Sequence, residues 1–298
     1  MRNRRIHLFT INYFSEYLDQ FIDSMVAQES PHPLSIYILD NSGELQADKY
    51  AHLSSDKCRI VMLRAPRNLG FGRGHNFLFK QFLSEFLPDD WLVIANNDLL
   101  VPHDFMMQFF SSLHDDERAI YSPQIMTKRA NKDVLWYSGA KVGTLTGNIH
   151  FDKAPLKYEE KSTDFIPATF IAMQAKYFAE LRGFSRKFFM YCEDLDLCVR
   201  AKDASIYLVV KDINLTHFVG SGNKGTYSDL FLYEMTKNTY YCIDKGIIGT
   251  NPYAKAGFYF RYLFLRYAQL MVFSKKPLQQ CSAVTRGWLD GRKFVKTA

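Results

Sequence analysis

Short apolar runs alternate with segments of helical periodicity through the first hundred residues. Buried strands are predicted at residues 5–11, 34–39, 59–63 and 91–95. Between the first two, apolar side chains recur at helical spacing from Tyr17 to Val26, with Ser15 as the expected N-terminal cap. Strands that alternate with helices predict an α/β fold with a mainly parallel sheet and right-handed crossovers.

The pattern changes in the second half of the chain. Gly139, Gly143 and Gly147 punctuate short alternating segments between residues 134 and 151, which predicts a hairpin or a meander. Further strands are expected at 165–173 and 206–210, and helices at 176–182, 193–202, from 228 onward and at 255–276. The sequence therefore predicts that a helical region follows the sheet.

The composition fits a folded protein with a large core. Hydrophobic residues make up 47% of the 298 positions and charged residues 23%, so folding needs neither disulfides nor a structural metal. Five scattered cysteines without a CxxC pair argue against a zinc ribbon and for a reducing compartment. The basic N-terminus leads into a short apolar run without a small-residue cleavage site, so we expect a strand rather than a signal peptide. The sequence contains no uninterrupted run of about 18 apolar residues, so no transmembrane span is expected.

Polar side chains follow the predicted strands where these strands end, at Asp40, Asn68 and the Asn96-Asn97-Asp98 segment. In open α/β sheets, ligands bind at this carboxyl edge. A carboxylate at Asp98 beside amides suits a divalent cation that bridges a diphosphate. A turn that caps a helix starting near Pro102 is the alternative.

Three carboxylates lie within four positions, at Glu193, Asp194 and Asp196. Successive helical residues point about 100° apart, so at most one or two of them can face a cleft. Their apolar neighbours predict partial burial and a raised pKa, which suits a general base. The alternative is a helix N-terminus whose dipole favours acidic residues.

Two further segments carry candidate chemistry. Residues 67–76 are Gly-rich but fail both the GxGxxG and the P-loop patterns, which leaves an anion cradle of backbone N–H groups near Arg67 and Arg73, or simply a tight loop. His217 precedes the Gly220-Ser221-Gly222 loop, a position that suits a metal ligand beside a moving lid. A structural or surface histidine is the alternative.

The chain resembles bacterial family 2 glycosyltransferases of the rhamnosyltransferase-like branch from about Ile6 to Gly246. The resemblance rests on the order of LFTINYF, YILDNSG, RNLGFGRGHN, VIANNDLLVP, GFSRKFFMYCEDLDLCVRAK, THFVGSG and MTKNTYYCIDKG. It implies a GT-A fold, in which a Rossmann-like, mainly parallel sheet is flanked by helices. We expect a catalytic domain at 1–227, with a nucleotide-sugar half at about 1–100 and an acceptor half at about 101–227, and a helical C-terminal region at 228–298.

The resemblance also implies roles for individual residues. The nucleotide-sugar donor is expected at Thr10, Asn12, Asp40, Asn68, Gly70, Asn96, Asn97 and Asp98. Asp40 matches the Asp that contacts the base, and Asn96 and Asp98 occupy the ends of the DxD motif. A divalent cation, Mg²⁺ or Mn²⁺, is expected at Asp98 and His217. Asp194 matches the catalytic base of the ED motif, and Glu193 beside it is the second residue expected in the catalytic site. Asn96 replaces the first Asp of DxD, so the site carries one negative charge fewer.

The reaction implied by the family is inverting, which requires one direct displacement and one carboxylate base. The branch favours dTDP-L-rhamnose as donor, with UDP-hexoses as the alternative. The implied acceptor is a glycan or a polyprenyl-diphosphate-linked glycan of a cell-surface polysaccharide such as O-antigen or capsule. Trp136, Tyr137 and Phe170 are candidates to line the acceptor side, or belong to the core.

The last predicted helix, at residues 255–276, has a basic half and an aromatic half. Such a helix is typical of one that lies on an anionic membrane surface. We therefore expect a cytoplasmic protein that is peripheral on the inner face of the bacterial plasma membrane. A helix packed on the core or on a second subunit is the alternative, and the oligomeric state stays open.

Two other function classes remain. A catalytically silent nucleotide-sugar-binding or assembly protein is compatible with Asn96, whereas the intact Glu193-Asp194 pair argues against it. A nucleotidyltransferase would need a Gly-rich basic loop after the first strand, where this chain has Thr10-Ile11-Asn12-Tyr13. The basic charge and the aromatics also suit nucleic acid, but an aromatic core with solvated charges explains them, and no nucleic-acid partner is expected.

Overall fold

The computed structural model describes residues 4–129, 132–143, 148–201, 206–218, 227–249 and 252–297. Within these ranges a ten-stranded sheet has the order β10-β12-β6-β11-β4-β1-β2-β3, with β5 and β7 attached at β12 and β6. The first four strands are β1 (Ile6–Asn12), β2 (Leu34–Asp40), β3 (Cys58–Arg64) and β4 (Trp91–Ala95). They run parallel, as predicted, and β1, β2 and β4 are almost wholly buried.

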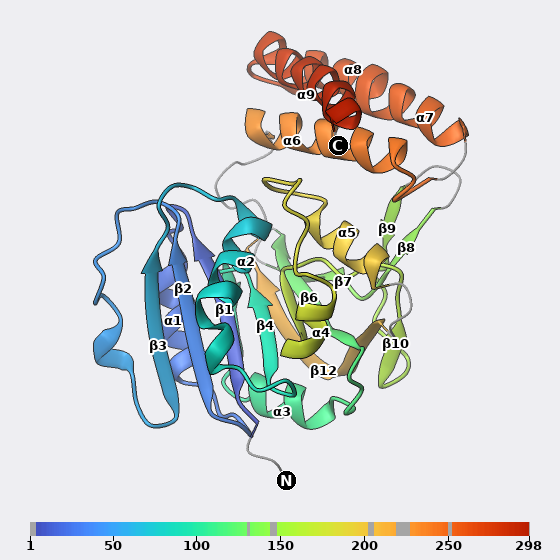
Figure 1. The fold of residues 1–298 in the computed structure, drawn as a ribbon. Coiled ribbons are helices and arrows are strands. Elements are labelled where there is room, and N and C mark those ends of the chain that lie inside the picture. The colour runs from blue at the N-terminus through green and yellow to red at the C-terminus, as the bar shows by residue number, and fades with distance from the viewer. Residues whose placement is uncertain are drawn as a thin grey trace.

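Helices α1 (Leu18–Val26) and α2 (Phe71–Phe82) lie on opposite faces of these strands (Figure 1). Right-handed crossovers that run in opposite directions along the sheet require this arrangement. The prediction that Ser15 caps α1 is wrong, because its Oγ accepts the N–H of Tyr17 in a turn before the helix starts.

Most of the Gly-rich segment is helical rather than loop, because α2 already begins at Phe71. Its glycines allow close packing. A Cβ on Gly74 would lie 2.6 Å from the Ile11 side chain, and one on Gly72 would lie 2.9 Å from Phe184. The missing side chains therefore let α2 approach both the sheet and the later chain.

The second half adds strands of both directions. Strand β11 (Phe170–Gln174) runs antiparallel to β4 and to β6 (Ile120–Arg129), and begins five residues later than residue 165, where the strand was expected. Strand β12 (Ile206–His217) runs parallel to β6 and extends well beyond the predicted end at residue 210. The remaining elements are β5 (Leu99–Leu100), α3 (Phe105–Ser112), β7 (Lys132–Tyr137), β10 (Glu160–Ser162), α4 (Ala175–Glu180) and α5 (Glu193–Arg200).

The predicted hairpin before residue 151 is confirmed in part. Strands β8 (Ala140–Val142) and β9 (Ile149–Phe151) pair antiparallel in a small second sheet. Strand β7 instead pairs with β6 in the main sheet. The segment between residues 132 and 151 is therefore divided between two sheets.

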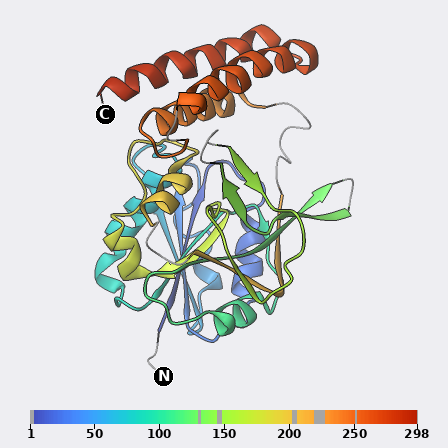
Figure 2. The same ribbon diagram turned by 90° about the vertical axis from the view of Figure 1, so that its right-hand side faces the viewer.

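The C-terminal residues form a layer of helices above the edge of the sheet opposite the N-terminus (Figures 1 and 2). Helix α6 (Asp229–Asp244) lies nearest the sheet and is capped by Ser228, whose Oγ accepts the N–H of Phe231. The helix expected at 255–276 is α7 (Pro252–Phe258), a π-helical segment (Tyr259–Leu265) and α8 (Arg266–Phe273). No helix in the described ranges is both long and apolar enough to cross a bilayer.

The sequence prediction missed α9 (Pro277–Thr297) as a separate helix. This helix packs along α6 through two glycines four residues apart. A Cβ on Gly291 would lie 2.9 Å from the carbonyl oxygen of Lys237, and one on Gly287 would overlap that of Tyr233. The two glycines therefore bring the backbones of α6 and α9 together.

Candidate functional site

The ends of β1 and β2 bring the first predicted donor residues together. Asn12 and Asp40 are register neighbours, and the N–H of Asn41 donates to the carbonyl of Asn12 at 2.8 Å. Thr10 lies on the same strand as Asn12, and its buried Oγ1 has no hydrogen-bond partner. These side chains lie at the carboxyl edge, where parallel sheets bind ligands.

Asp40 is almost wholly buried and organises the turn that follows β2. Its Oδ1 accepts the N–H of Ser42 at 2.9 Å and the Ser42 hydroxyl at 2.5 Å, and its Oδ2 accepts the N–H of Leu45 at 3.0 Å. Burial raises the pKa of Asp40, but these hydrogen bonds outweigh it and hold the pKa below the usual value. Arg64 lies 3.9 Å from Oδ2 at the open side. The carboxylate is thus held charged in a fixed orientation.

The loop before α2 is fixed from two directions. Asn68 Oδ1 accepts the N–H of Gly70 at 2.9 Å, and Asn41 donates to the Gly70 carbonyl at 3.2 Å. Gly70 has φ +77°, and a Cβ there would overlap the carbonyl of Phe189. The same carbonyl accepts the N–H of Phe71 at 2.9 Å. Only glycine meets both demands.

These contacts use three of the donors expected in an anion cradle at this helix start. The N–H groups of Gly70 and Phe71 are already bonded within the protein, and Arg73 donates to the carbonyl of Arg186 at 2.8 Å. A tight loop therefore explains Gly70 just before α2, and the anion cradle stays a prediction for the other N–H groups of the helix start.

The turn after β4 lies beside His217. Oδ1 of Asp98 is 3.1 Å from Nε2 of His217, and Nδ2 of Asn96 is 3.4 Å from the same nitrogen. Strand pairing causes this meeting, since β5 pairs antiparallel with β12 and sets His217 opposite Leu99. Asn97 turns away, because its Nδ2 donates to the Ile11 carbonyl at 3.0 Å. Asn97 therefore anchors the turn to β1.

The Asp98 and His217 side chains fit a divalent cation. Oδ1 of Asp98 is buried without a hydrogen-bond partner, and the imidazole nitrogen that faces it is Nε2 of His217. Two ligands on neighbouring octahedral positions, each about 2.1 Å from an ion, lie about 3.0 Å apart, close to the distance of 3.1 Å between Asp98 and His217. Among the described residues, no group of three or more His, Cys, Asp or Glu side chains gathers at one point. The Gly220–Gly222 loop beside His217 lies outside the described residues.

The three carboxylates of α5 diverge around the helix. Asp196 accepts the Nε of Arg200 at 2.7 Å, in an ion pair one turn along α5. Glu193 is buried against Gly72 of α2. A Cβ added to Gly72 would lie 3.3 Å from the Cβ of Glu193. Asp194 is only partly buried, and its Oδ2 accepts the N–H of Ala168 at 3.2 Å.

Both ED carboxyls have raised pKa values. Burial raises the pKa of Glu193 well above the usual value, and the charges of Asp194 and Glu234 raise it further. Burial also raises the pKa of Asp194, although the N–H groups of Ala168 and Leu195 oppose the rise. Asp194 therefore combines an accessible position with increased basicity.

One short segment joins the Asp194 carboxylate to the turn after β4. Ala168 donates its N–H to Asp194, and the carbonyl of the next residue, Thr169, accepts the N–H of Asn96 at 2.9 Å. The ED motif and the turn after β4 lie far apart in the sequence but are hydrogen-bonded to two adjacent residues, Ala168 and Thr169.

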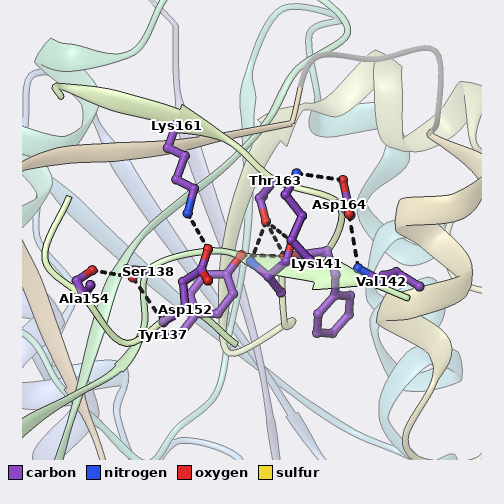
Figure 3. Close-up of polar contacts among 11 residues, drawn as sticks. Tyr137, Ser138, Lys141, Val142, Asp152, Ala154, Lys161, Thr163 and Asp164 are labelled. Carbon is purple, nitrogen blue, oxygen red and sulfur yellow. Dashed lines mark hydrogen bonds and ion pairs between the residues drawn. The ribbon is translucent and has the colours of Figure 1, made fainter. Parts of the chain in front are cut away.

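The aromatic candidates for the acceptor side separate into two kinds. Tyr137 is fully buried within the hydrogen-bonded segment that Figure 3 shows, and its hydroxyl donates to the Phe165 carbonyl at 2.6 Å. Phe170 is also fully buried. Both rings therefore belong to the core rather than to an exposed acceptor surface. Trp136 is half-buried, and its ring centre lies 5.5 Å from that of His217.

Sequence analysis assigned no role to Asn41 or Asn238. Asn41 joins the β2 turn to the loop at Gly70. Asn238 of α6 donates to the carbonyls of Met190 and Tyr191, just before α5. The only sequence signal was their presence in two of the resembling segments, YILDNSG and MTKNTYYCIDKG.

Comparisons with solved structures bear out the fold. The chain is similar to GalNAc-T7, solved with UDP, GalNAc and Mn²⁺, with a TM-score of 0.62 and 12% identity over 93% of this chain and 59% of that one. It thus spans less than two thirds of GalNAc-T7. TarS of S. aureus with UDP-GlcNAc gives a TM-score of 0.57 and 12% identity, covering 98% of this chain and 81% of that one. The mannosyltransferase PcManGT of Pyrobaculum calidifontis, with GDP-Man and Mn²⁺, gives 0.54 and 10%, covering 99% and 88%. The predicted GT-A fold is confirmed.

Sequence comparisons agree with this fold. The chain is 24% identical over 196 residues to rhamnosyltransferase WbbL of Escherichia coli strain K12, covering 62% of this chain and 74% of that protein. Residues 6–182 match the family described as Glycosyl transferase family 2. This match covers more than half of the chain, including the β1, β2 and β4 edge, and it establishes that the protein belongs to glycosyl transferase family 2.

Proposed function

We propose that the protein is an inverting, metal-assisted glycosyltransferase that moves a sugar from a nucleoside-diphosphate donor to a hydroxyl of a glycan acceptor. The observation that carries this proposal is the approach of Asp98 and His217 at the carboxyl edge, with Asp194 tied to the same edge through Ala168 and Thr169. The family resemblance favours dTDP-L-rhamnose as donor, and the similarity to rhamnosyltransferase WbbL supports rhamnose as the sugar. UDP-hexoses are the alternative, since TarS was solved with UDP-GlcNAc.

Asp98 and His217 would hold a Mg²⁺ or Mn²⁺ ion against the donor diphosphate. When bound, such a cation neutralises the negative charge that grows on the leaving nucleoside diphosphate. Mg²⁺ commonly takes one or two carboxylates and completes its shell with substrate phosphates and water, which fits the small protein ligand set here.

The nucleotide would lie along the ends of β1 and β2. Asp40 is held charged there and would contact the nucleotide's base. Thr10, Asn12, Asn68 and Gly70 would surround the rest of the donor. The loop at Asn68 and Gly70 has little freedom, because Asn41 and Phe189 hold it from both sides. Such a preformed edge orients the donor at small entropic cost.

Asp194 would act as the general base. Its carboxylate takes the proton from the acceptor hydroxyl while the hydroxyl oxygen forms a bond to the anomeric carbon. The bond from that carbon to the diphosphate oxygen breaks at the same time, from the opposite face. Asp194 is favoured over Glu193 and Asp196, because Glu193 is buried against α2 and Asp196 is paired with Arg200.

We further propose a catalytic domain at residues 1–227 and a helical region at 228–298 that contacts the inner face of a bacterial plasma membrane. Apolar side chains are exposed along α7, the π-helical segment, α8 and the start of α9, including Phe264 at 63%, Val272 at 71% and Phe273 at 77%. Lys275 and Lys276 lie beside them in exposed positions. Apolar and basic groups together suit an anionic lipid surface, where a polyprenyl-diphosphate-linked acceptor of polysaccharide synthesis would lie.

The proposal is tested by transfer and hydrolysis assays with dTDP-L-rhamnose and a panel of UDP- and GDP-sugars. Each donor is supplied with Mn²⁺, with Mg²⁺ or with EDTA. We expect turnover of one donor class that EDTA abolishes. Tight donor binding without any transfer or hydrolysis would instead favour the silent binding protein.

A further inference from the structure

Helix α6 contacts the segment that leads into α5 at several points. The Lys187 ammonium donates to the Tyr241 hydroxyl at 2.7 Å, and the Phe188 ring lies edge-on to the Tyr241 ring with 5.8 Å between their centres. At the other end, the rings of Tyr191 and Phe231 lie 5.2 Å apart. The chain just before the ED motif is therefore docked on the C-terminal helical layer, as Figure 1 shows for α5 and α6.

Asn238 makes the most direct of these contacts. Its Nδ2 donates to the carbonyl of Met190 at 2.8 Å and to the carbonyl of Tyr191 at 3.0 Å, and it lies 3.3 Å from Oε2 of Glu234. The Asn238 side chain is wholly buried. Met190 and Tyr191 are partly buried, so loss of these bonds would leave two partly buried carbonyls without their Asn238 donor.

The two residues before α5 have left-handed backbone conformations that L side chains rarely adopt. Tyr191 has φ +68°, and Cys192, which precedes the first residue of α5, has φ +69°. Such a conformation is strained for an L residue and persists only where its surroundings fix it. The two bonds from Asn238 end on this strained turn.

We infer that Asn238 is a positioning residue for the reaction: its side-chain amide fixes the left-handed turn at Tyr191 and Cys192 and so sets the direction in which α5 presents Asp194. The inference rests on the proposed role of Asp194 as base. It gives α6 a part in catalysis, although α6 lies outside the residues that the family model matches.

The opposite side of the same turn touches the donor loop. The carbonyl of Phe189 accepts the N–H of Phe71 and lies against Gly70. The turn is therefore held between the predicted donor site and α6. Release of the α6 side would allow Asp194 to shift while the loop at Gly70 stays bonded to Asn41.

The test compares Asn238→Ala and Asn238→Leu with Thr236→Ala. The leucine variant keeps the branched skeleton of the Asn238 side chain but removes both donor hydrogens of its amide. Thr236 is buried on the same helix and donates only to the Leu232 carbonyl within it, so its variant controls for a weakened α6. Each protein is measured at the same interval below its own Tm.

Two readouts separate positioning from stability. In hydrogen exchange, amides of residues 189–197 should exchange at least about 10-fold faster in both Asn238 variants than in Thr236→Ala. In transfer assays, kcat should fall about 100-fold relative to Thr236→Ala, while the donor Kd stays within about threefold.

Exchange rates and kcat values equal to those of Thr236→Ala would overturn the inference. If the wild-type protein transfers no sugar from any donor, the proposed function fails, and hydrogen exchange alone then decides whether Asn238 fixes the turn.

Discussion

Nε2 of His217 lies 3.1 Å from Oδ1 of Asp98, although Asp98 follows β4 and His217 is the last residue of β12. The pairing of β5 with β12 produces this approach, and the Phe218 N–H reinforces it by donating to the Asp98 carbonyl at 3.0 Å. The contact thus depends on strand register rather than on a mobile side chain.

If these two side chains hold a cation, His217→Ala should weaken Mn²⁺ binding in the presence of nucleoside diphosphate. The loss should exceed the 10- to 100-fold that is typical of outer-shell partners, since a ligand itself is removed. Free Mn²⁺ can be measured by electron paramagnetic resonance during titration. His52→Ala, at an exposed histidine, is the control. Equal affinities of the two variants would remove His217 from the metal site.

The Gly70 backbone should be intolerant of any side chain, for two separable reasons. Gly70 and Gly43 have nearly the same φ, at +77° and +76°, but a Cβ on Gly43 meets no atom within 4 Å. Gly43→Ala should therefore cost only about 1–2 kcal/mol of unfolding free energy, the price of the left-handed backbone. Gly70→Ala should cost clearly more, because it also displaces Phe189. Urea unfolding measures both, and equal costs would mean that the Phe189 contact is unimportant.

Glu193 should make the protein less stable as the pH rises. Its pKa is raised in the folded state above the usual 4.5, so folding favours the neutral carboxyl. That contribution is fully present below pH 4.5 and is lost as the pH rises through the raised value. Glu193→Gln, which is always neutral, should have a flatter stability profile, with part of the slope left because the pKa of Asp194 is also raised. Thermal unfolding from acid to alkaline pH tests this, and parallel profiles would contradict it.

The exposed apolar side chains of the C-terminal layer should be needed for membrane binding. Phe264→Ser combined with Phe273→Ser should reduce flotation with anionic vesicles by about 10-fold or more, since each buried CH₂ contributes about 0.8 kcal/mol. Leu83→Ser with Leu87→Ser, at similarly exposed positions of 53% and 56%, is the matched control. High salt should weaken the binding of the wild type. Equal flotation of both double variants would direct attention to a protein partner for this surface.

Much of the sheet could be predicted because each buried strand is a continuous apolar run between turn residues. The runs at β1, β2 and β4 are almost wholly buried, and their ends are where polar residues gather. The carboxyl ends of parallel strands meet at one edge of the sheet, so the sequence alone predicts that Asp40 and Asp98 lie at the same edge.

Tertiary packing determined the features that sequence patterns did not reveal. Gly72 and Gly74 resemble loop residues, yet they lie in α2. Glycine is needed at these helical positions because Phe184 and Ile11 occupy the space that a side chain would take. Helix α9 was missed because two glycines interrupt its pattern, and both glycines lie where α9 packs against α6. The role of Asn238 depends on two carbonyls from another element, which no local pattern encodes.

The central claim is that Asp194 takes the proton of the acceptor hydroxyl, and kcat of Asp194→Asn measures this most directly. The substitution keeps the shape and removes the ability to accept a proton, so kcat should fall about 10²- to 10⁴-fold. Donor affinity should hardly change, because the proposed donor contacts come from other residues. Glu193→Gln and Asp196→Asn, from the same helix, should each keep most of the activity. If Asp194→Asn retains more than about a tenth of the wild-type kcat while either control loses it, the assignment of the base to Asp194 is contradicted.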